Sequence, residues 1–557
     1  MASSLTLTQN TIFNIFSRLP LRSVTRFKPL SNDWAYLTST PTFVVDHLRR
    51  FSSDPSLILF CYNTQFDFNF GILLITDPTQ NFTCWHLVVP LEEPLTLFPK
   101  IMGKIPSDMF ERLPRLRVLY LDGNKLSGKI PLSLFKCKEL EFIDFSYNSL
   151  EGILSKEIGN STMLKSLSLS GNLFEGDIPI TFGNLRDLQL LDISDNDLSS
   201  TLSSSKSSFL SSLANCSNLI YLSFARNPLI SGYLPATIGN LSVSLQYFDA
   251  SSSNISGRIP GEIGNWNPNN LGYLGLNENQ LEGILPLSLI NCSELEVLNV
   301  ANNNLSDTFP HWLGMLPKLQ ALILRSNRFH GSIQVSSTTF SFSRLQMVDL
   351  SHNDFTGLLP TEFFQNLKAL KEDKYGYDGY QYSVNLTIKG FELEFLKKVH
   401  MPIFTCIDLS DNGFHGEIPK VVGELRLLRA LNLSHNSLTG PIPTSVGNLA
   451  ALESLDLSFN KLSGRIPSQL TNLTFLEVLR FWNNNLVGPI PSGKQFNTFE
   501  NDIYRGNLGL CGFPLSKECS KDERQEPGQD EEDNGNGIAF IWKVRNDGVW
   551  MWNGIRN

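Results

Sequence analysis

The sequence has little cysteine, little charge and no long apolar run. Eight cysteines in 557 residues are too few for a disulfide-rich scaffold, and 18% charged residues fall below the usual quarter. No 18 apolar residues run together, which predicts no transmembrane helix, and residues 5–16 lack the pattern of a signal peptide. With 41% hydrophobic residues the chain can still build a core, so a disordered chain is excluded. As it stands, the chain is expected to be soluble and not secreted.

The charges that are present are unevenly distributed. The net charge of −9 argues against nucleic-acid binding. Residues 1–50 carry a net +4, and the acidic run at 521–533 carries −5. No HExxH, Walker A or GxSxG motif occurs, and the eight histidines are scattered. We therefore expect no enzyme, no catalytic residues, no cofactor and no metal site.

Internal repeats dominate the rest of the chain. The segment LRVLYLDGNKLSGKIP at 116–131 recurs as the pattern LxxLxLxxNxLxGxIP, and the spacing between repeats is 24 residues in eight of thirteen intervals. Its asparagine falls at 124, 148, 172, 196, 227, 279, 303, 327, 353, 412, 436, 460 and 484, with Ser253 in the remaining place. A single coil of this length cannot bury its own core, so the coils must stack.

This pattern predicts an α/β repeat solenoid with a parallel β-sheet on its concave face. The leucines of LxL point inward from a short strand, and the asparagine amide can satisfy backbone groups of adjacent coils. The cysteines at equivalent repeat positions, Cys137, Cys216 and Cys292, are expected to be small buried hydrophobes.

The GxIP form resembles the plant-type repeat of extracellular leucine-rich-repeat receptors, and the C-terminal half resembles plant receptor-like proteins more closely. YQYSVNLTIKGFELEF (380–395) resembles the island that such proteins carry before their last four repeats, and 488–519 resembles their C-terminal cap. The resemblance gives repeats at 101–365, an island at 366–404, the last four repeats at 405–495, a cap at 496–520 and an acidic, disordered tail at 521–557.

This resemblance implies a non-enzymatic recognition protein at the plasma membrane or outside the cell. It would bind a peptide or protein ligand in defence or developmental signalling and act through receptor-kinase co-receptors. The resemblance makes Cys511 and Cys519 a cysteine pair, and a disulfide there would close a loop only in an oxidising compartment.

The N-terminal segment points to another class of protein. Residues 8–50 resemble a plant F-box, on motifs that include Leu19, Pro20, Val24, Phe27 and Trp34. These residues would bind a Skp1-type adaptor, which makes the alternative function the substrate-recognition subunit of a ubiquitin ligase in the cytoplasm or nucleus. Residues 51–100 resemble a truncated F-box-associated β segment or a linker. Either the chain is a true fusion, or it is a composite of two genes.

Side chains flanking the inward leucines are expected to face solvent on the concave sheet. They include Asp144, Asn277, Glu278, His352, Asp408, Asp411, His435, Asp456 and Phe459. As ligand-binding residues we select seven more: Tyr120, Asp122, Tyr147, Arg226, Arg325, Arg480 and Trp482. Arg480 and Trp482 stand out because the family that the chain resembles usually carries small polar or aliphatic residues in that strand, and an exposed tryptophan on a rigid sheet is a candidate contact residue.

Ten N-x-[ST] sequons are compatible with a glycosylated protein. They begin at Asn81, Asn160, Asn215, Asn240, Asn254, Asn291, Asn304, Asn385, Asn432 and Asn472.

Overall fold

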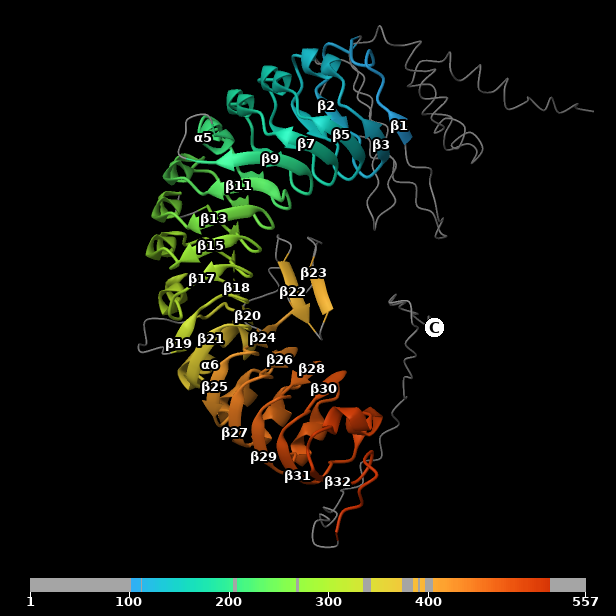
Figure 1. Ribbon diagram of the computed structural model, residues 1–557, viewed down its shortest axis with the longest axis vertical. Helices are drawn as coiled ribbons and strands as arrows, with labels where there is room; N and C mark the ends of the chain where they lie inside the picture. The colour runs from blue at the N-terminus through green and yellow to red at the C-terminus, as the bar shows by residue number, and fades with distance from the viewer. Residues whose placement is uncertain are drawn as a thin grey trace, which may run out of the picture.

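The computed structural model describes residues 102–520, except 112, 204–207, 267–269, 334–341, 373–383, 389–390 and 396–403, and of 384–395 it describes the backbone alone. The F-box-like segment 8–50, the segment 51–100, Asn81 and the acidic tail lie outside the described residues. The described coils stack into an arc (Figure 1), which confirms the predicted leucine-rich-repeat solenoid.

The concave side of the arc is one parallel sheet of 14 strands, one from each coil. In order they are β2 (Val118–Tyr120), β4 (Phe142–Asp144), β6 (Ser166–Ser168), β8 (Leu190–Asp192), β10 (Tyr221–Ser223), β12 (Tyr247–Asp249), β14 (Tyr273–Gly275), β16 (Val297–Asn299), β18 (Ala321–Ile323), β20 (Met347–Asp349), β24 (Cys406–Asp408), β26 (Ala430–Asn432), β28 (Ser454–Asp456) and β30 (Val478–Arg480).

This inner sheet continues across the long insertion. Strands β20 and β24 pair directly, with Met347 opposite Cys406 and Asp349 opposite Asp408. The insertion itself contains the antiparallel hairpin β22 (Val384–Ile388) and β23 (Phe391–Phe395). Figure 1 shows this hairpin on the inner side of the arc.

A second layer of parallel strands follows the inner sheet and is split in two. The first part has nine strands: β1 (Met102–Lys104), β3 (Lys125–Gly128), β5 (Ser149–Ile153), β7 (Leu173–Asp177), β9 (Asp197–Leu202), β11 (Leu229–Tyr233), β13 (Asn254–Arg258), β15 (Gln280–Gly283) and β17 (Asn304–Leu305). The second has seven: β19 (His330–Ser332), β21 (Asp354–Leu358), β25 (Gly413–Gly416), β27 (Ser437–Pro441), β29 (Lys461–Gly464), β31 (Asn485–Pro489) and β32 (Gly509–Cys511).

Short helices, mostly 3-10, cover the convex side. They are η2 (Leu132–Lys136), η3 (Lys156–Asn160), η4 (Ile180–Asn184), α5 (Phe209–Leu213), η5 (Ala236–Asn240), η6 (Gly261–Asn265), η7 (Leu287–Asn291), η8 (His311–Met315), α6 (Thr361–Asn366), η9 (Lys368–Leu370), η10 (Lys420–Glu424), η11 (Thr444–Asn448), η12 (Ser468–Asn472) and η13 (Lys494–Thr498). A last short helix, η14 (Asn501–Tyr504), lies instead beside the inner strand β30. The coils approach closely here: a Cβ built on Gly423 would lie 2.1 Å from the carbonyl oxygen of Ser445.

The repeated asparagines connect neighbouring coils, as expected. Asn148 donates from Nδ2 to the carbonyl oxygen of Leu121 in the preceding coil at 2.8 Å, and its Oδ1 accepts from the amide of Leu126 at 3.0 Å. Ser253 has a shorter side chain and forms only a 3.4 Å bond to the carbonyl of Ser251 within its own coil. Between the sheets and the helices, one hydrophobic core runs the length of the solenoid and includes the buried Cys137, Cys216 and Cys292.

Candidate functional site

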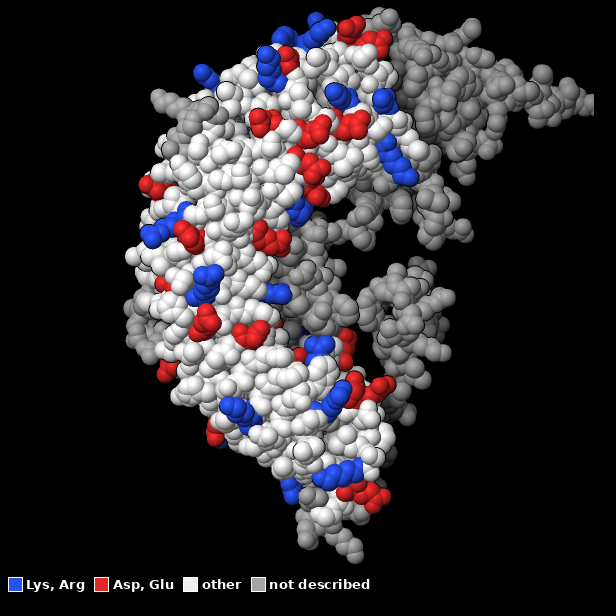
Figure 2. Space-filling view, in the orientation of Figure 1, with Lys and Arg blue, Asp and Glu red and all other residues white. Residues whose placement is uncertain are grey.

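Each inner strand turns its first and third residues away from the leucine core. In β24, Ile407 belongs to the main core, whereas Cys406 and Asp408 lie on the concave side. Two columns of side chains therefore cross the sheet from coil to coil. Most of the described surface visible in Figure 2 is uncharged, and the charged side chains on it are scattered.

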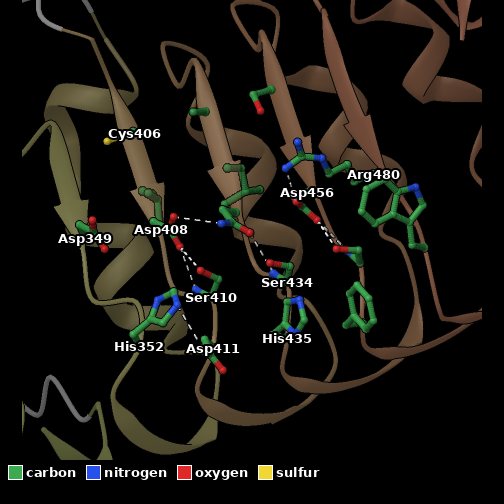
Figure 3. A pocket seen from close by; sticks show the side chains of 18 residues that line it. Asp349, His352, Cys406, Asp408, Ser410, Asp411, Ser434, His435, Asp456 and Arg480 are labelled. Carbon is green, nitrogen blue, oxygen red and sulfur yellow. Dashed lines mark hydrogen bonds and ion pairs between the residues drawn. The ribbon is translucent and has the colours of Figure 1, made fainter. Parts of the chain in front are cut away.

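A hollow of about 420 Å³ opens on the concave face of the last coils. Strands β20, β24, β26, β28 and β30 and the turns that follow them supply its walls (Figure 3). Its polar and aromatic lining comprises Asp349, His352, Cys406, Asp408, Ser410, Asp411, Asn432, Ser434, His435, Ser454, Asp456, Ser458, Phe459, Arg480 and Trp482.

The carboxylates of the hollow are held by serines of their own coils. Oδ1 of Asp408 accepts bonds from the Ser410 amide at 2.9 Å and from the Ser410 hydroxyl at 2.6 Å. Asp349 and Asp456 make the same pair of bonds to the serine two residues later. An Asp-x-Ser sequence therefore fixes one oxygen of each carboxylate and leaves the other oxygen for a second partner.

The second oxygens have different partners. Oδ2 of Asp408 accepts a 2.9 Å bond from Nδ2 of Asn432. Oδ2 of Asp456 lies 3.2 Å from Nη1 of Arg480, whose guanidinium carbon lies 5.6 Å from the centroid of the Trp482 ring. Nearer the turns, His352 Nε2 lies 3.2 Å from Asp411 Oδ2, and the His435 ring stacks on Phe459 at 4.2 Å.

Burial changes the acidity of the two central carboxyl groups. Burial raises the pKa of Asp349, although the Ser351 bonds and the charge of Arg325 oppose the shift. Burial, and then the charge of Asp349, raise the pKa of Asp408 to about 7. It is therefore unfavourable for the Asp349 and Asp408 carboxyl groups both to be fully ionised at neutral pH.

A column of aromatic and apolar side chains also crosses the concave face. The rings of Tyr221, Tyr247 and Tyr273 stack at 4.2 and 4.3 Å on successive strands, and the Tyr247 hydroxyl donates to Asp249 at 3.2 Å. The same column continues with buried side chains at Val297, Ala321, Met347, Cys406 and Ala430. We did not single out this column from the sequence, although tyrosine at the same position of three successive repeats was a visible signal.

The seven selected ligand-binding residues do not form one site. Arg480 and Trp482 both line the hollow. Tyr120 lies on the first inner strand beside Asp122 and Asp144, and Tyr147 and Arg226 lie in the turns after β4 and β10 with positive φ angles. Arg325 follows β18, next to Asp349. The hollow adds Asp349 and Asn432, and an Asp-x-Ser sequence at equivalent repeat positions could have found Asp349.

The sequons occupy three kinds of place. Seven asparagines are exposed: Asn160, Asn215, Asn240, Asn254, Asn291, Asn304 and Asn472. Asn432 instead lies half-buried in the hollow, where its Oδ1 accepts from the Ser434 amide at 3.1 Å. Asn385 lies in β22, whose side chains are not described.

The C-terminal cap closes the solenoid. Strand β32 pairs with β31, and Cys511 forms a disulfide with Cys519 across a Cα–Cα distance of 5.0 Å. Among the described residues no helix is both long enough and apolar enough to cross a membrane. Within the same residues, no group of three or more His, Cys, Asp or Glu side chains is arranged to hold a metal ion.

Comparison with known proteins agrees with this architecture. The family model described as "Leucine rich repeat" matches residues 114–174, 269–329 and 405–462, and a second model of that description matches 344–366. Receptor-like protein 34 of Arabidopsis thaliana is 49% identical over 327 residues, which cover 56% of this chain and 33% of that protein. Receptor-like protein 43 of the same plant is 43% identical over 208 residues, 36% of this chain and 28% of that one.

Solved structures show the same fold. The plant peptide hormone receptor RGFR1, determined in complex with RGF2, superposes with a TM-score of 0.55 and is 28% identical in sequence. The match covers 76% of this chain and 62% of the RGFR1 chain. The chain spans about a third or less of the curated relatives named above. It is a leucine-rich-repeat protein whose repeats are related to those of plant receptor-like proteins.

Proposed function

We propose that this chain recognises a peptide or protein ligand with the concave face of its solenoid, as part of a plant cell-surface receptor-like protein. The observation that carries the proposal is the hollow on β20–β30. There a rigid parallel sheet presents carboxylates, a guanidinium and aromatic rings in one open concavity. Such a surface combines aromatic and arginine anchors with polar groups held in place, which is typical of recognition surfaces.

The related proteins support this function. Receptor-like protein 34, which matches 56% of this chain, is named a receptor-like protein. The structural neighbour RGFR1 is a plant peptide hormone receptor determined in complex with RGF2. The proposed function is non-enzymatic binding at the plasma membrane or cell exterior, with signalling through receptor-kinase co-receptors. No described residue favours the alternative role in a ubiquitin ligase, because the F-box-like segment lies outside the described part of the chain.

The proposal is tested by capturing ligands with the intact chain. The full-length protein is immobilised and exposed to the secreted peptides and proteins of plant tissue, and the retained molecules are identified by mass spectrometry. We expect a Trp482→Ala variant to lose ligands that the unmodified chain retains. A matched variant on the convex side, Lys156→Ala in η3, should retain them. Identical retention by all three chains would contradict recognition through this concave surface.

A further inference from the structure

Three aspartates of the hollow, each fixed by a serine, differ in one respect. At Asp456 the negative charge has a cationic partner, because Arg480 lies 3.2 Å away. At Asp349 and Asp408 no lysine or arginine of the described residues lies within ion-pair distance. These two aspartates are directly opposite each other on the paired strands β20 and β24.

Hydrogen bonds hold the Asp349 and Asp408 carboxylates in place. One oxygen of each carboxylate is fixed by its serine, and Asn432 donates to the remaining oxygen of Asp408. These donors are neutral. Burial is the first cause of the raised pKa of both groups: at Asp408 the charge of Asp349 adds to the rise, and at Asp349 the charge of Arg325 opposes the rise without cancelling it.

The same hollow already shows which group fits a carboxylate of this kind. Asp456 and Asp408 stand at the same position of their coils, each followed by a serine that makes the same two bonds. Between Asp456 and the Trp482 ring lies the guanidinium of Arg480. The chain thus forms its own ion pair at one of these three equivalent positions.

A second observation in the hollow is independent of the acidic groups. Nε1 of Trp482 is shielded from solvent and has no hydrogen-bond acceptor among the described residues. A buried donor without a partner is unusual in a folded protein. A peptide in the hollow brings backbone carbonyl groups, which are the acceptors that this indole lacks.

We propose that Asp349 and Asp408 bind the cationic side chain, arginine or lysine, of an extended peptide segment whose backbone reaches Trp482. This inference rests on the proposed function and names the chemistry of its ligand. Three strand-to-strand steps separate β24 from β30. At about 4.8 Å a step they span about 14 Å, which four or five extended residues cover.

The test selects random dodecapeptides displayed on phage against the immobilised full-length chain. We expect the selected peptides to be enriched in arginine or lysine at one position. Affinity for a synthetic copy should fall at least tenfold for Asp408→Asn, and by a similar factor when citrulline, which is neutral, replaces the arginine. The citrulline peptide should bind the unmodified chain and the Asp408→Asn chain equally.

The controls separate this inference from the function on which it rests. Asn432 and Asn299 occupy the same strand position naturally and accept the same backbone bond, so Asp408→Asn is expected to fold. Asp192→Asn makes the matched change on β8, outside the hollow, and should leave affinity unchanged. Bound peptides without basic residues, or affinities that Asp408→Asn does not alter, would overturn the inference alone. Failure to select any peptide would overturn the proposed function as well.

Discussion

Two parts of the inner sheet use one backbone for different side chains. In β10–β18, called here the apolar half, the first residues of the strands are three stacked tyrosines followed by Val297 and Ala321. In β20–β30, called the polar half, carboxylates and an arginine line the open hollow. Because the strands pair in the same parallel register throughout, the difference comes only from which side chains the repeats carry. We expect the apolar half to stabilise the solenoid, and the polar half is the part proposed for recognition.

Removing one aromatic ring from each half tests whether the two halves contribute differently to stability, and it has the largest expected effect. Tyr247 is buried and stacked on both sides, so Tyr247→Ala should lower the free energy of unfolding by about 3–5 kcal/mol. Phe459 is exposed, and Phe459→Ala should cost about 1 kcal/mol or less. Urea denaturation followed by circular dichroism measures both values.

The tyrosine hydroxyl provides the control. Tyr247→Phe keeps both stacking contacts and removes the hydroxyl, which bonds Asp249 at 3.2 Å and also contacts the neighbouring tyrosines, so about 1 kcal/mol should be lost. If Tyr247→Ala were no more costly than Phe459→Ala, the tyrosine column would not stabilise the fold and the division between the halves would be wrong.

The asparagine ladder should not distinguish the halves. Asn303 and Asn460 each bond the carbonyl of the preceding coil at 2.9 Å and accept from an amide at 2.9 Å. Replacing either by alanine leaves these buried groups unpaired, so each substitution should cost about 2–3 kcal/mol. The converse change, Ser253→Asn, should stabilise the chain by about 1 kcal/mol because it restores the missing bonds. Unequal losses from the two alanine variants in urea denaturation would show that the scaffold itself differs between the halves.

The polar half should depend on pH through Asp408. Its pKa is about 7 in the folded chain, well above the usual value for aspartate. Between roughly pH 4 and pH 7 the folded chain keeps a proton that the unfolded chain has lost, so this group makes stability fall as the pH rises. The rise of this pKa from the usual aspartate value to about 7 corresponds to at most about 4 kcal/mol, so Asp408→Asn should stabilise the protein by up to that amount at pH 8 and by almost nothing at pH 4.

Thermal unfolding at the two pH values measures this change. A gain in melting temperature of equal size at pH 8 and pH 4 would show that Asp408 carries no unfavourable charge in the folded protein. The unfavourable negative charge of the Asp349–Asp408 pair, which the proposed cationic ligand would neutralise, would then be absent.

The repeat sequence predicted the solenoid because its signals are local and periodic. Leucine and asparagine recur at fixed offsets, and each offset corresponds to one position in a coil, so the inner strands, the ladder and the buried cysteines could all be predicted. The hollow was harder, because it depends on contacts between coils. Asp349 and Asp408 are far apart along the chain and become neighbours only because the sheet continues past the insertion. Arg480 and Trp482 could be noticed from their residue types, but their partner Asp456 and the shape of the hollow required the structure.

The smallest expected effect concerns Asn432, which the sequence alone groups with the other glycosylation sites. Its carboxamide bonds Asp408 and the Ser434 amide inside the hollow, whereas Asn160 and Asn472 stand exposed at the ends of convex helices. A glycan on Asn432 would fill the polar half of the concave face. When the full chain is produced in the secretory pathway of plant cells, Asn160→Gln and Asn472→Gln should each remove one glycan from the intact mass. Asn432→Gln should remove none, and a glycopeptide carrying sugar on Asn432 would show that this half of the sheet is not kept open for a ligand.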